Sequence, residues 1–84
     1  MSAVLLVFPR SRDVAFVRRH ADHLRTRRTA EAAERYLQAQ LRIQAETMAR
    51  RGIASGQIDR EIGALEAAIR RELDRPRVQP GGAA

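Results

Sequence analysis

The stretch "SGQIDREIGALEAAIRRELD", residues 55–74, carries the clearest structural signal in this chain of 84 residues. Its large apolar side chains recur at every third or fourth position: Ile58, Ile62, Leu65, Ile69 and Leu73. Because an α-helix turns once in about 3.6 residues, this spacing places them on one face of a helix. Ser55 is a suitable N-cap, and the residue before Pro76 disfavours helical backbone. The stretch therefore predicts an amphipathic helix over 55–75.

Two further helices are expected before this one, over 11–28 and 29–52. Ser11 and Thr29 are suitable N-caps, and Gly52 can adopt the left-handed conformation that commonly follows a helix. Because only 53–54 separates the second helix from the third, the two are predicted to form an antiparallel hairpin that resembles a coiled coil. We therefore predict an all-α fold with three helices: a long antiparallel hairpin and a shorter, basic first helix.

The second helix carries more apolar surface than one neighbour can cover. One stripe is predicted to face the third helix: Leu37, Leu41 and Met48. A second strip lies beside it: Ala32, Tyr36, Ala39 and Ile43. Since a surface helix normally has a single apolar stripe, we expect the second helix to be central. The third helix would cover one of its sides, and the first helix or another protomer would cover the other.

The chain opens with an apolar run, "AVLLVF" over 3–8, which ends at Pro9. No positive residue precedes this run, and it is far shorter than the roughly 20 residues of a membrane-spanning helix. We therefore expect neither a signal peptide nor a contact with the membrane. Because both faces of the run are apolar, both need covering. The sequence predicts an extended arm over 1–10, packed on its own helices or on a partner through five residues: Leu5, Leu6, Phe8, Tyr36 and Ile43.

The composition allows one small helical domain, predicted over 1–75, and a disordered tail over 76–84 that is rich in glycine, proline and alanine. Apolar residues make up 44% of the chain, but 15 of them are alanines, and there is no cysteine to form a disulfide. Such a thin core favours self-association, so we expect a homodimer. The lack of cysteine also fits a cytoplasmic protein.

No arrangement of side chains predicts catalysis. The two histidines of "HADH", residues 20–23, share a helix face, but a zinc site needs three or four ligands, and the chain has no other histidine and no cysteine. We therefore expect exposed, titrating histidines and no bound metal. There is no glycine-rich phosphate loop and no Ser–His–Asp order. The protein is predicted to be non-enzymatic, without a cofactor.

The positive charge is concentrated in the first third of the chain. Residues 1–28 hold seven arginines against two aspartates, a net charge of +5, whereas residues 55–84 hold five basic and five acidic residues. On the first helix, one face is predicted to carry most of the binding groups: Arg12, Phe16, Arg19, His23 and Arg27. Arginine forks suit carboxylate and phosphate groups. We therefore predict that this face binds an acidic surface.

Three explanations of the basic face stay open at this point. The first is a small binding or regulatory protein that recognises an acidic partner protein. The second is a dimeric regulator that binds nucleic acid, because an aromatic ring among arginines can stack on bases while the arginines neutralise phosphates. The third is a structural module that associates with itself, with Phe16 covered by the arm and the arginines forming an ordinary surface.

Residues 3–41, an apolar run followed by two helices, resemble the ribbon-helix-helix repressors. Those proteins pair strands in a dimer and place them in the major groove of DNA, so the resemblance implies a dimeric nucleic-acid-binding regulator. In that family one face of the strand carries polar side chains that contact bases, whereas both faces of 3–8 are apolar here. The second helix is also longer, and a third follows it, which puts base recognition by this run in doubt.

The segment "VFPRSRDVAFVRR", residues 7–19, is similar to the start of a group of short, uncharacterised bacterial proteins from chromosomes and prophages. Those proteins open with apolar residues, a Phe-Pro pair and an arginine-rich helix. The resemblance rests on Val7, Phe8, Pro9 and the arginines that follow. It implies a small accessory protein or a regulator from a mobile element, and it implies no catalytic residues.

Overall fold

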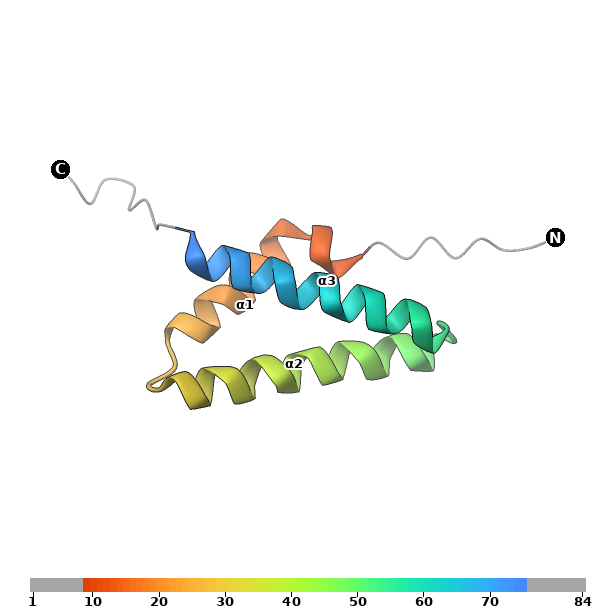
Figure 1. Ribbon diagram of the computed structural model, residues 1–84, viewed down its shortest axis with the longest axis horizontal. Helices are drawn as coiled ribbons and strands as arrows, with labels where there is room; N and C mark the ends of the chain where they lie inside the picture. Colours follow the sequence, from red (N-terminus) through yellow and green to blue (C-terminus); the bar gives the residue numbers. More distant parts are fainter. Residues whose placement is uncertain (1–8, 76–84) are drawn as a thin grey trace.

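Three α-helices and one short 3-10 helix follow one another along residues 9–75, the part of the chain that the computed structural model describes (Figure 1). The 3-10 helix η1 spans Arg10–Arg12, and α1 spans Val14–Arg25. Helix α2 spans Ala30–Arg50 and α3 spans Ser55–Asp74. The prediction of an all-α fold with three helices is confirmed. Leu5, Leu6, Phe8 and the predicted tail over 76–84 lie outside the described residues.

The first helix begins later than the sequence predicted. Asp13, rather than Ser11, is the N-cap of α1, and its carboxylate accepts a hydrogen bond of 3.1 Å from the backbone N–H of Phe16. Ser11 instead belongs to η1, together with Arg10, which was predicted to be the last residue of the arm. A carboxylate is favoured at this position because it meets both the unpaired N–H groups and the positive end of the helix dipole.

The hairpin helices differ in how they start. The Thr29 hydroxyl accepts a hydrogen bond of 3.0 Å from the backbone N–H of Ala32, which confirms it as the cap of α2. The prediction that Ser55 caps α3 was wrong: the N-cap is Ala54, and no side chain closes this end. Between the helices, Gly52 has φ +83°, the left-handed conformation that glycine adopts without strain. This glycine ends α2 and turns the chain toward α3.

Helices α2 and α3 run antiparallel, as predicted, and α1 packs against both where the hairpin opens (Figure 1). The prediction that the second helix is central was wrong. Helix α3 contacts all the other elements, with its most extensive interface on α1, whereas the interface between α1 and α2 is smaller. The hydrophobic pattern had not indicated this arrangement, because the single apolar stripe of α3 appeared to need only one neighbouring helix.

The hydrophobic core lies where α1 meets the hairpin. Helix α1 contributes the largest share of it: Phe16, Val17, Ala21 and Leu24. From the hairpin come Leu37 and Leu41 of α2 and Leu65 and Ile69 of α3. Leu37, Leu65 and Ile69 are 1–2% exposed. Toward Gly52 the described hairpin has no buried residue, so the fold is anchored at one end by α1.

Candidate functional site

The predicted basic face is divided by the fold into buried and exposed members. Phe16 was expected on the outer side of the first helix but is only 8% exposed. It shares the inner side of α1 with His20 and Leu24, which follow at intervals of four residues. The sequence argument had treated His20 as an exposed histidine, and it is 9% exposed. Phe16 and His20 are buried in addition to the predicted apolar stripe, so the buried face of α1 is wider than predicted.

His20 is held by a side chain from another helix. Its Nδ1 lies 2.9 Å from the hydroxyl of Tyr36 on α2, at hydrogen-bond distance. The two rings are 5.9 Å apart between centroids, and the ring of Phe16 lies 4.4 Å from that of His20. His23, one turn further along α1, lies 5.7 Å from the Tyr36 ring. These four rings form a continuous group where α1 and α2 meet.

Two arginines lie over this group of rings. The guanidinium carbon of Arg27 is 4.3 Å from the centroid of Tyr36, and that of Arg10 is 4.9 Å from the centroid of Phe16. Both distances are within the range of cation–π attraction. We call these six residues the arginine–aromatic cluster: Arg10, Phe16, His20, His23, Arg27 and Tyr36. Sequence reasoning had missed Arg10 and His20, and it had assigned Tyr36 to packing of the arm.

The exposed members of the predicted face are Arg12, Arg19, His23 and Arg27, of which His23 and Arg27 belong to the cluster. Within residues 9–75, no carboxylate forms an ion pair with Arg12, Arg19 or Arg27. Ile43, expected to pack against the arm, is 48% exposed on the described surface. Arg19, near His20, and Arg27, over Tyr36, thus present cations without acidic partners at the edge between α1 and α2, while Arg12 lies in η1.

Two other arginines, Arg70 of α3 and Arg25 of α1, do have acidic neighbours. Arg70 lies 2.9 Å from a carboxylate oxygen of Glu34 and 2.7 Å from one of Glu66. On α1, Arg25 lies 2.7 Å from Asp22 and donates a hydrogen bond of 2.6 Å to the backbone carbonyl of Glu72. Arg10 of the cluster is also paired, 3.1 Å from a carboxylate oxygen of Asp13, so Arg27 is the cluster arginine without an acidic partner among the described residues.

Burial lowers the pKa of His20 below its ordinary value, and the nearby charges of His23 and Arg19 lower it further. Both effects disfavour the imidazolium, because it would be partly removed from water and surrounded by like charge. His20 is therefore neutral near pH 7 and shares one proton with the Tyr36 hydroxyl in their hydrogen bond. Within the described residues, no three histidine or acidic side chains are placed to hold one metal ion.

None of the helices in the described part of the chain is long and apolar enough to cross a membrane. Comparison with curated proteins and with solved structures gave no match. A family model does match, and it covers the whole chain, residues 1–84. By that match the chain belongs to the family of unknown function DUF6074.

Proposed function

We propose that this protein is a non-enzymatic binding protein that recognises an acidic surface of a partner protein through the edge between α1 and α2. The observation that carries the proposal is that Arg12, Arg19 and Arg27 have no acidic partner among the described residues, with Arg27 stacked on the ring of Tyr36. Stacking on Tyr36 restrains the Arg27 guanidinium, so less side-chain entropy is lost when it binds a carboxylate.

The burial of the rings and the arginines stacked on them favour a protein partner over a single-stranded nucleic acid. Binding by base stacking needs exposed aromatic faces. Phe16 is buried and Arg10 lies over its ring, while Arg27 occupies a face of Tyr36. The rings therefore serve to position arginines, and the exposed groups at this edge are guanidinium forks, which match carboxylates in pairs of parallel hydrogen bonds. The exposed side chain of Ile43 adds an apolar contact for a protein surface.

Fluorescence titration tests this function with three labelled probes of equal net charge: a glutamate-rich peptide, a DNA duplex and a single-stranded oligonucleotide. We expect saturable binding of the peptide at low salt, with an affinity above that for either nucleic acid. Tighter binding of an oligonucleotide, with the steep salt dependence that counterion release produces, would assign the surface to nucleic acid instead. Absence of binding to all three probes would refute recognition of acidic surfaces by charge.

We also propose that the protein forms a homodimer and that it is located in the cytoplasm. The small core, with eight buried apolar residues among those described, supports a second interface on another copy of the chain. Light scattering of the full-length protein at increasing concentration measures this directly. A mass that stays at that of one chain would exclude the homodimer.

A further inference from the structure

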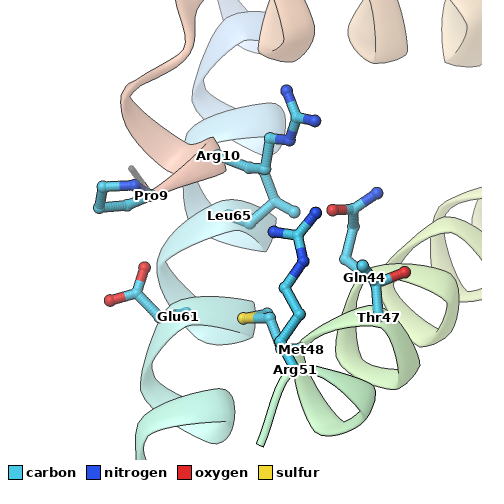
Figure 2. Close-up of a pocket in the computed structure, with 8 residues that line it drawn as sticks. All are labelled: Pro9, Arg10, Gln44, Thr47, Met48, Arg51, Glu61 and Leu65. Carbon is cyan, nitrogen blue, oxygen red and sulfur yellow. The ribbon is translucent and has the colours of Figure 1, made fainter. Parts of the chain in front are cut away.

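A cleft lies between η1, the end of α2 and the first half of α3, and Arg10 is one of the residues that line it (Figure 2). It has a volume of about 220 Å³. Its apolar lining comes from Pro9, Met48 and Leu65, and its polar lining from Arg10, Gln44, Thr47, Arg51 and Glu61. Since pockets for drug-sized ligands span roughly 300–1,000 Å³, this cleft suits a smaller molecule.

Arg51 is the cation that the fold directs into this cleft. It follows the last turn of α2, and its guanidinium extends toward Leu65 and the side of Gln44 (Figure 2). Within residues 9–75 it forms no ion pair, and the Gln44 amide has no hydrogen-bond partner there. The carboxylate of Glu61 points to the opposite side (Figure 2). The guanidinium thus lies beside the apolar residues of the cleft, with the amide oxygen of Gln44 on the same side (Figure 2).

We propose that this cleft binds a small molecule in which one carboxylate is joined to a short apolar chain. The carboxylate would pair with the fork of Arg51, because arginine matches carboxylates in a bidentate geometry, and a turn of the Gln44 amide would bring its N–H groups toward the same carboxylate. The apolar chain would lie on Met48 and Leu65. Among the charged groups of the lining, Arg10 is paired with Asp13 and Glu61 points away, so Arg51 is the one cation left to pair with a ligand, which favours a monoanion over a phosphate dianion.

The same chemistry has two sources, a free aliphatic carboxylate and the C-terminal carboxylate of a peptide with an apolar last residue. Octanoate is the probe for the first source, and a short acetylated peptide ending in leucine is the probe for the second. Octanamide and the C-terminally amidated peptide are the neutral controls. The probe that binds more tightly identifies the source, and either result supports the cleft if binding requires the carboxylate.

Methyl-labelled methionine gives a direct readout of the cleft, since the chain has only two methionines, and Met48 is the one that lines it. We expect octanoate to shift the Met48 methyl signal in a saturable way and octanamide to bind at least about tenfold more weakly, because the amide cannot form the charged pair. The Met48→Leu variant assigns the signal.

Arg51→Gln should weaken the binding of octanoate by about tenfold or more. The matched control is Arg28→Gln, which removes the same charge from an exposed arginine that precedes α2, at the other end of that helix from Arg51, and that is not part of the cleft lining. It should change the affinity by less than about twofold, since a distant exposed charge contributes little. Equal effects of the two variants, or no saturable shift with either carboxylate probe, would overturn the proposal. Arg51 is not in the arginine–aromatic cluster, so this result is independent of the proposed function.

Discussion

Tyr36→Phe is the substitution that examines the arginine–aromatic cluster most selectively. It removes one hydroxyl and keeps the ring, so the contacts of Tyr36 with His23 and Arg27 are preserved. His20, which is 9% exposed, then loses the Tyr36 hydroxyl that lies 2.9 Å from its Nδ1. Leaving a buried polar group unpaired costs about 1–3 kcal/mol. Because a domain of this size shifts by about 4–8 °C per kcal/mol, the melting temperature should fall by at least about 4 °C.

A double-mutant cycle with His20→Leu separates the hydrogen bond from general packing. Replacing both partners by apolar groups of similar shape is nearly neutral, because no unpaired polar group is left. His20→Leu with Tyr36→Phe should therefore be more stable than Tyr36→Phe alone, as measured by chemical denaturation followed by circular dichroism. If Tyr36→Phe changes the free energy of unfolding by less than about 0.3 kcal/mol, or if the two substitutions are additive, then the hydrogen bond does not stabilise the contact of α1 with α2.

Three further predictions concern the core, the pH dependence and the backbone. Leu65→Ala should cost about 2–5 kcal/mol, since the side chain is 2% exposed, whereas Arg60→Ala on the exposed side of α3 should cost little; equal melting temperatures would mean that α3 is oriented differently. Because folding lowers the pKa of His20, the unfolded state takes up a proton at this residue first as the pH falls through about 6.5, so the free energy of unfolding should decrease below that pH. The decrease should be smaller in His20→Leu. If the pH dependence of stability is unchanged in this variant, His20 is not its cause. Gly63→Ala should stabilise the protein by about 1 kcal/mol, because an added Cβ meets no atom within 4 Å and alanine favours helix. Gly52→Ala should destabilise it because of the positive φ. A shift of the melting temperature in the same direction for both variants would contradict this description of the backbone.

The helices could be predicted from the sequence because they depend on local signals. The stripe that includes Leu65 and Ile69 repeats at helical spacing, and Thr29 precedes its helix with a side chain that caps it, so both predictions were confirmed. Competing signals caused the errors at helix starts. Ser11 and Asp13 are both good caps, and the carboxylate is favoured because it also interacts with the helix dipole.

The cluster could not be predicted in the same way because it depends on tertiary contacts. The partner of His20 is 16 residues away on another helix, and nothing in the spacing of "HADH" indicates it. The inward position of Phe16 belongs to the same tertiary contacts, since its ring lies 4.4 Å from that of His20. One signal was available: His20 continues a run with Phe16 and Leu24 at intervals of four residues, which extends the apolar face of α1.

The measurement that tests the central claim most directly is the affinity of two double variants of equal charge for the glutamate-rich peptide. Arg19→Gln with Arg27→Gln removes two cations from the edge between α1 and α2, whereas Arg42→Gln with Arg60→Gln removes two exposed cations from other faces, neither in an ion pair within the described residues. The first should weaken binding by about tenfold and the second by less than about twofold, with circular dichroism confirming that both are folded. Equal losses would show that the peptide responds only to net charge and that this edge is not a binding site.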